Sequence, residues 1–247
     1  MKGINMFKTK KLLLIALFIL IFLATILAVI ARPYLKTIYY HSQGQRTITD
    51  IINLTHDNVH KNLKPYFDKS NISFPPEKIT FVSFKQEEKM ELWVSENDEW
   101  IYVKAYPILG LSGESGPKLK EGDRQVPEGV YNIIGLNPNS YFHLAMLIDY
   151  PNKYDKKNAK NDNRTNLGGD ICIHGSNVSA GCLAMGDDAI EELFYIVVKA
   201  GIDNTKVIIA PYDFRKDNNQ IELENINIEW LPELYSIIDE ELNDYVH

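Results

Sequence analysis

The chain has 247 residues and a formal charge of −7, with 45% hydrophobic residues, 11% aromatic residues and two cysteines. Charged residues make up 24% of it, beside 14 Gly and 11 Pro, which excludes a disordered, collagen-like or low-complexity protein. Two cysteines are too few for a disulfide scaffold, and the acidic balance disfavours nucleic acid as a partner.

The N-terminus has the pattern of a membrane anchor. Four lysines fall in the first 11 residues, and residues 12–31 carry no charge. A helix of that length spans about 30 Å, the hydrocarbon thickness of a bilayer. We therefore predict a cytoplasmic basic segment over residues 1–11, a single transmembrane anchor over 12–31, and a cell-membrane protein whose remaining chain is extracytoplasmic. A cleaved signal peptide ending near Ala31 is the alternative, and it also exports the chain.

The exported part is acidic: 22 basic against 33 acidic residues leave it a formal charge of −11. Residues 32–76 are predicted to form a tether followed by a helix from about Ile48 to Lys64, with Thr49 and Asp50 as candidate caps. The globular domain is expected over residues 77–215. The remaining residues, 216–247, form an acidic tail with a helix whose first turn contains Pro232.

Short runs rich in β-branched and aromatic residues dominate the domain and predict a mostly β fold with peripheral helices and a mostly antiparallel sheet. The expected strands are 79–84, 90–95, 100–106, 130–134, 141–148, 170–174 and 206–211. Glu96-Asn97-Asp98 predicts a hairpin turn, and a helix capped by Asp187 or Asp188 should end at Gly201. Two polar loops, 110–117 and 152–169, are expected, the second as a mobile lid.

One stretch, residues 170–185, carries recognisable chemistry. A predicted strand ends at His174, a turn-rich loop follows, and Cys182 comes next. A cysteine attacks a carbonyl as its thiolate, and a neighbouring imidazole can take the thiol proton. Gly181 leaves room for an acyl group, and its N–H with that of Cys182 is a candidate oxyanion hole. Ser179 is expected to hydrogen-bond within the loop or to the substrate.

These residues also carry a resemblance to a known family. Ile173-His174-Gly175 followed by Ser179-Ala180-Gly181-Cys182-Leu183 resembles the signature of the L,D-transpeptidase (YkuD-type) catalytic domain, an exported cysteine enzyme of peptidoglycan. Residues 112–131 and 137–144 resemble the YafK-like branch of that family. The resemblance covers about residues 77–215.

The resemblance implies a β-sandwich-like fold, no cofactor or metal, and peptidoglycan stem peptides as substrate. By position, Cys182 would form a thioester acyl-enzyme, His174 would accept and return a proton, and the Gly175 carbonyl would orient the imidazole. Two departures are the short interval from His174 to Cys182 and Ala184 where the family usually has arginine. The YafK-like branch also resembles amidases, so hydrolysis through the same acyl-enzyme is the alternative to transpeptidation.

Two further residues are candidates for substrate binding. His143 matches a histidine of the branch pattern, and its alternative is a structural sheet histidine. Arg124 is a candidate ligand for a substrate carboxylate, and its alternative is a salt bridge with Asp123 or Glu121.

Cys172 shares a strand face with His174 by period-two alternation and is interpreted as a structural thiol. A reversible disulfide with Cys182 is a secondary hypothesis that would silence the enzyme. The cysteines also allow a zinc site, made by Cys172, His174, Cys182 and His143. A noncatalytic wall-binding module is a further interpretation of the domain, based on the missing arginine.

Overall fold

The computed structural model of the protein describes residues 14–29, 31, 35, 44–114, 116–216 and 226–246. The chain divides into two compact units, Met1–Gly44 and Gln45–His247.

In the first unit, residues 14–29 are helical. They fall inside the predicted anchor, whose residues 12, 13 and 30 lie outside the described part, as does the basic segment 1–11. None of the helices that the structure describes combines the length and the apolar character needed to cross a membrane.

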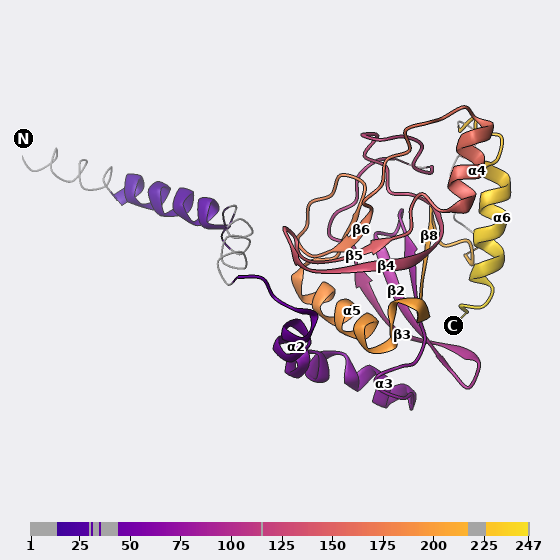
Figure 1. The fold of residues 1–247 in the computed structure, drawn as a ribbon. Helices are drawn as coiled ribbons and strands as arrows, with labels where there is room; N and C mark the ends of the chain where they lie inside the picture. Colours follow the sequence, from indigo (N-terminus) through magenta and orange to yellow (C-terminus); the bar gives the residue numbers. More distant parts are fainter. Residues whose placement is uncertain are drawn as a thin grey trace, which may run out of the picture. The chain divides into compact units, whose positions relative to one another are not determined.

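The second unit is built on one sheet of eight strands in the order β3-β2-β1-β8-β4-β5-β6-β7 (Figure 1). The strands are β1 (Ile79–Phe84), β2 (Lys89–Glu96), β3 (Glu99–Pro107), β4 (Gly129–Ser140), β5 (His143–Ile148), β6 (Cys172–His174), β7 (Leu183–Ala184) and β8 (Thr205–Ala210). The predicted strands are confirmed apart from their ends, and β7 was not predicted. The predicted β2–β3 turn is confirmed as well, with positive φ angles at Asn97 and Asp98.

The expectation of a sandwich is wrong in one respect, because all the strands join in a single curled sheet rather than in two packed sheets. The sheet is mostly antiparallel, as predicted, but two of its strand pairs, β1–β8 and β6–β7, are parallel. The order of the strands along the chain does not reveal the parallel pair β1–β8, because β8 is the last strand in the sequence but lies in the middle of the sheet.

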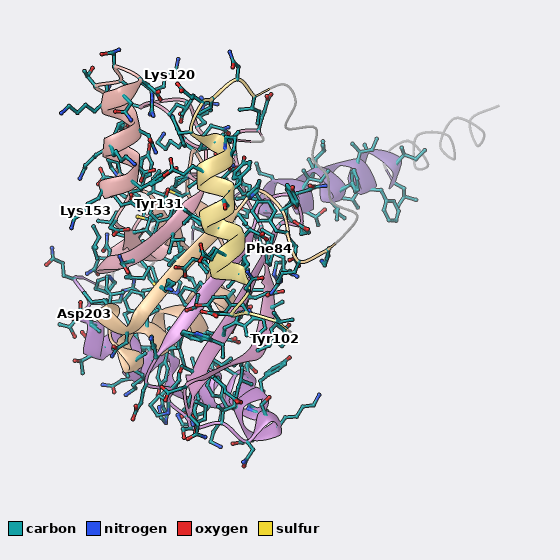
Figure 2. The ribbon with its side chains drawn as sticks, turned by 90° about the vertical axis from the view of Figure 1, so that its right-hand side faces the viewer. Phe84, Tyr102, Lys120, Tyr131, Lys153 and Asp203 are labelled. Atoms are coloured by element: carbon teal, nitrogen blue, oxygen red, sulfur yellow. The ribbon has the colours of Figure 1, made fainter. Side chains whose placement is uncertain are left out.

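Helices cover both faces of the central strands. Buried side chains of α2 (Ile48–Asn62), α3 (Lys64–Ser70) and α5 (Asp187–Ala200) share one core with Ile79, Phe81, Val207 and Ile209. The alternate residues Val82, Phe84, Ile208 and Ala210 pack with α6 (Leu231–Leu242) in a second core. Figure 2 looks onto this second face, where α6 lies over the strands beside α4 (Lys153–Asn161). Strands β1 and β8 are therefore buried on both sides, as central strands should be.

The helix ends follow local side-chain chemistry. Thr47, rather than Thr49 or Asp50, is the N-cap of α2, and it forms a capping box with Asp50. Neither Asp187 nor Asp188 caps α5: the N-cap is Gly186, and Asp187 Oδ1 accepts the Ser176 N–H at 2.9 Å. Gly201 ends α5 as predicted, at φ +92.

The segment 152–169 is not the expected lid loop, because it contains α4. Asn152 caps this helix by accepting the N–H groups of Tyr154 and Asp155, and Asp155 completes a capping box. Trp230, just before α6, donates its indole N–H to Asp162 at 2.8 Å. The capping pattern was present in the sequence, but the lysine-rich composition of the segment suggested a loop.

A buried polar network joins α6 to the sheet. The Glu128 carboxylate accepts from Lys85 Nζ at 2.8 Å and from the Tyr235 hydroxyl at 2.8 Å. The Lys85 and Glu128 side chains are only 9% and 0% exposed, so neither charge is solvated once its partner is removed. Residues beyond the predicted domain end at 215 thus contribute to its core.

We expect Glu128→Ala to lower the free energy of unfolding by about 3–5 kcal/mol, because Lys85 would be left buried and unpaired. Tyr235→Phe removes one hydrogen bond and should cost about 1–3 kcal/mol. Urea unfolding followed by circular dichroism measures both. If Glu128→Ala unfolded at the same urea concentration as the parent, the network would be irrelevant to stability.

Candidate active site

Two short parallel strands bring the reactive side chains together. β6 pairs with β7 so that Ile173 lies opposite Leu183, and one step back along this register Cys172 lies beside Cys182. Ile173 and Leu183 are fully buried. Because side chains alternate between the two faces of a strand, Cys172, Cys182 and His174 share the opposite face.

His174 is held in one orientation. Its Nδ1 lies 2.6 Å from the Gly175 carbonyl oxygen, and its ring stacks on Phe142 with centroids 4.4 Å apart. A carbonyl only accepts hydrogen bonds, so Nδ1 carries the hydrogen and Nε2 of the neutral ring is left able to take a proton. The side chain is 2% exposed. The Gly175 contact is the one that the sequence resemblance implied.

Gly175 is required by close packing. A Cβ at this position would lie 2.5 Å from the Phe142 carbonyl oxygen and 2.9 Å from Asp187 Oδ1. Any side chain here would displace Phe142 from the His174 ring. Phe142 is not among the residues predicted from the sequence. Its position next to the candidate residue His143, near the start of a predicted strand, was a usable signal.

The Cys182 thiol lies among hydrogen-bond donors. Its Sγ accepts the Cys172 backbone N–H at 3.4 Å and lies 3.8 Å from the Asp170 carbonyl oxygen. The hydrogen bond from the Cys172 thiol, followed by those from the His174 imidazole and the Cys172 N–H, lowers the pKa of the Cys182 thiol well below its usual range. Burial opposes this shift without reversing it. Cys182 therefore has the properties of a nucleophile.

Ser179 hydrogen-bonds within its own loop. Its hydroxyl donates to the Cys182 carbonyl oxygen at 2.6 Å and accepts the N–H groups of Gly181 at 3.2 Å and Cys182 at 3.0 Å. These are the two N–H groups expected to form an oxyanion hole. In the structure they are directed at Ser179 Oγ, which stabilises the turn that presents the thiol.

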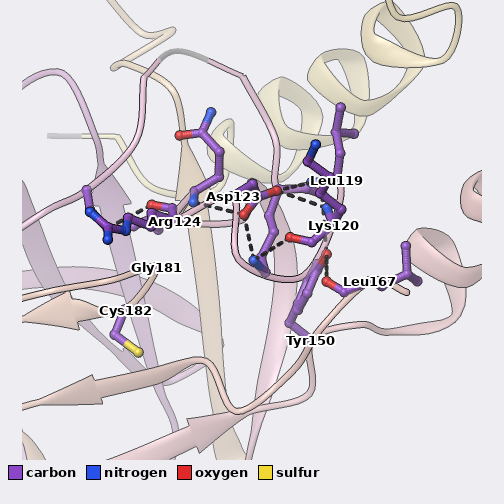
Figure 3. Close-up of polar contacts among 12 residues, drawn as sticks. Leu119, Lys120, Asp123, Arg124, Tyr150, Leu167, Gly181 and Cys182 are labelled. Atoms are coloured by element: carbon purple, nitrogen blue, oxygen red, sulfur yellow. Dashed lines mark hydrogen bonds and ion pairs between the residues drawn. The ribbon is translucent and has the colours of Figure 1, made fainter. Parts of the chain in front are cut away.

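Arg124 lies on a turn against this loop. Its side chain is exposed and makes no ion pair within the described ranges, while its carbonyl oxygen accepts from the Ser112 hydroxyl at 2.7 Å. Asp123 pairs instead with Lys118 at 2.6 Å. Figure 3 shows Arg124 and Asp123 on the turn next to Gly181 and Cys182. Asp123, the expected partner in the alternative salt bridge, is thus paired with Lys118, and the exposed Arg124 side chain is left available to a ligand.

His143 pairs with another side chain of the domain. Its side chain is buried, and Nε2 lies 2.7 Å from Glu191 Oε1 of α5. This is the arrangement expected of a structural histidine that fixes α5 to the sheet. Among the residues the structure describes, which include Cys172, His174, Cys182 and His143, no group of three or more His, Cys, Asp or Glu is arranged to hold a metal ion.

Ala184 stands where an arginine was expected from the family pattern, and its surroundings explain the replacement. The residue is fully buried, and its N–H and C=O pair with the backbone of Gly110 at 3.1 and 3.2 Å. A side chain on Gly110 would crowd this residue, because a Cβ there would lie 3.3 Å from the Ala184 Cβ. A guanidinium at this buried position would need a hydrogen-bonding or charged partner.

Known proteins are similar to the part of the chain that contains this site. The family model for YkuD, the L,D-transpeptidase catalytic domain, matches residues 81–209. The putative L,D-transpeptidase YafK of Escherichia coli (strain K12) is 34% identical over 134 residues, which are 52% of this chain and 52% of that protein. The chain thus matches about half the length of its curated relative.

Two solved structures are also similar. The helical cell shape determining protein Pgp2 of Campylobacter jejuni is 21% identical with a TM-score of 0.46, over 62% of this chain and 57% of that chain. L,D-transpeptidase 1 of Mycobacterium tuberculosis is 14% identical with a TM-score of 0.30, over 53% of this chain and 61% of that one. The family match, which covers more than half of the chain, carries the assignment. The chain belongs to the YkuD family and is an L,D-transpeptidase-like enzyme.

Proposed function

We propose that the protein is an exported, membrane-anchored cysteine acyltransferase that acts on peptidoglycan stem peptides through a thioester on Cys182. The observation that carries the proposal is that the β6–β7 register places Cys182 and His174 on one face, with Nδ1 of the imidazole fixed by the Gly175 carbonyl. Interaction with this imidazole also helps to lower the pKa of the Cys182 thiol. Export and anchoring are supported by the lysines of residues 1–11 and the uncharged run of residues 12–31.

The first half of the reaction is acylation. The Cys182 thiolate attacks the carbonyl carbon of a stem-peptide bond, and His174 Nε2 holds the proton that the thiol has lost. As the tetrahedral intermediate collapses, the C–N bond breaks and His174 protonates the leaving amine. The products are a free amine and a thioester. Both the buried ring and its fixed tautomer serve this proton transfer.

The second half is transfer of the acyl group. An acceptor amine attacks the thioester while His174 takes its proton, and Cys182 leaves as thiolate. With water as acceptor the same steps give a hydrolase, as in the amidases that the YafK-like branch resembles. Ala184 in place of the family's arginine keeps hydrolysis as the second candidate, because this departure resembles the YafK-like branch.

The first test is capture of the acyl-enzyme. Incubation of the protein with peptidoglycan fragments should give a mass adduct on Cys182, and products should be compared with and without an added amine. Cys182→Ser should form no thioester adduct and should lose turnover by a factor on the order of 10³ or more. A folded Cys182→Ser protein with parental turnover would exclude cysteine catalysis, and products unchanged by the amine would favour the hydrolase.

The second test concerns proton transfer. His174→Gln should lower kcat/KM by a factor on the order of 10² or more, because no group remains to protonate the leaving amine. His56→Gln, an exposed histidine of α2, serves as the matched control and should keep parental activity. Equal losses in the two variants would show that His174 acts only through stability.

The third test concerns Arg124 as a ligand for a substrate carboxylate. Arg124→Gln should raise KM by roughly 10-fold with little change in kcat, as expected for one charge-assisted hydrogen bond. Lys120→Gln removes an exposed positive charge from the same loop and controls for general electrostatics. If both variants raised KM equally, Arg124 would have no specific role.

A further inference from the structure

The two cysteines of the chain form a contact that the two-residue mechanism does not use. The β6–β7 register places their side chains next to each other on one face, and adjacent strands lie about 4.8 Å apart. The Cys172 N–H donates to Cys182 Sγ at 3.4 Å. Both sulfur atoms also lie near one acceptor, the Asp170 carbonyl oxygen, at 3.6 Å for Cys172 and 3.8 Å for Cys182.

Two adjacent thiols cannot both ionise readily, so their surroundings decide which one keeps its proton. Cys182 Sγ receives a backbone N–H and faces His174, both of which favour a negative charge there. The Asp170 carbonyl oxygen lies near both sulfurs and so does not by itself decide which one keeps its proton. The hydrogen bond to Cys182 and burial raise the pKa of the Cys172 thiol. The pair is therefore asymmetric, with Cys172 as donor and Cys182 as acceptor.

We propose that Cys172 is a positioning residue that holds Cys182 as a thiolate: its backbone N–H donates to the nucleophilic sulfur, and its S–H turns from the Asp170 carbonyl oxygen onto that sulfur when the sulfur is ionised. This inference rests on the proposed role of Cys182 and adds a second donor to the one supplied by His174. A donor at position 172 must have a small side chain, because the segment that carries Cys182 lies directly beside β6.

The test is the pH dependence of alkylation of Cys182 by iodoacetamide, with a phosphine reductant present to keep both cysteines as thiols. The site of alkylation is located by tandem mass spectrometry. The pH at the inflection of the rate reports the thiol pKa, and unlike the absolute rate it does not depend on the nucleophilicity of the thiolate. The full chain is used as parent, Cys172→Ala, Cys172→Ser and Ile173→Val.

We expect Cys172→Ala to raise the inflection by at least about one pH unit, because a thiolate donor is lost. Cys172→Ser keeps a small donor and should stay closer to the parent than to Cys172→Ala. Ile173→Val alters the opposite, buried face of β6 and should leave the inflection unchanged. Parental inflections in both folded Cys172 variants would overturn the proposal, as would equal shifts in Cys172→Ser and Cys172→Ala.

A negative result for Cys172 can be distinguished from a failure of the proposed function. If Cys182→Ser retained turnover, acyl transfer through Cys182 would be lost while the alkylation shift still stood. If Cys182 formed the acyl-enzyme and Cys172→Ala left the inflection in place, only the role of Cys172 would be lost.

Discussion

The site depends on the parallel register between β6 and β7. β7 has only two residues, too few to hold a strand pairing alone. Its other edge is paired as well, because the Leu109 and Gly110 N–H groups donate to the Ala184 carbonyl oxygen. On the β6 side, the Met185 N–H extends the pairing by donating to the His174 carbonyl oxygen at 2.8 Å. A slip of one residue would turn Cys182 toward the core and away from His174.

The backbone on either side of β6 adopts a conformation that non-glycine residues rarely use. Asp170 has φ +55 and Ser176 has φ +63. The turn at Asp170 aims its carbonyl oxygen at both thiols, and the turn at Ser176 is held by the Asp187 carboxylate at the start of α5. Unfavourable backbone angles of this kind persist where surrounding contacts enforce them, and here they flank the strand that carries His174.

Buried charges connect the site to the rest of the domain. Lys85 donates to the Gly116 and Val126 carbonyl oxygens as well as to Glu128, which bonds Tyr235 of α6. Gly116 lies just after Ser112 in the chain, and Val126 lies just after Arg124. The helix of the acidic tail thereby stabilises the loops that line the site, although it contributes no side chain to the reaction.

The sequence by itself predicted seven of the strands, the α5 and α6 helices, and the candidate pair of His174 and Cys182, because hydrophobic period and a glycine-bounded motif are local signals. It did not predict the mixed sheet, the α4 helix, the binding of His143 by Glu191, or the Ser179 contacts that occupy the expected oxyanion donors. Those features depend on which distant segments lie side by side. The contact of Cys172 with Cys182 is of the same kind: alternation placed Cys172 on the face of His174, but only the β6–β7 register decided that its N–H would meet the nucleophilic sulfur.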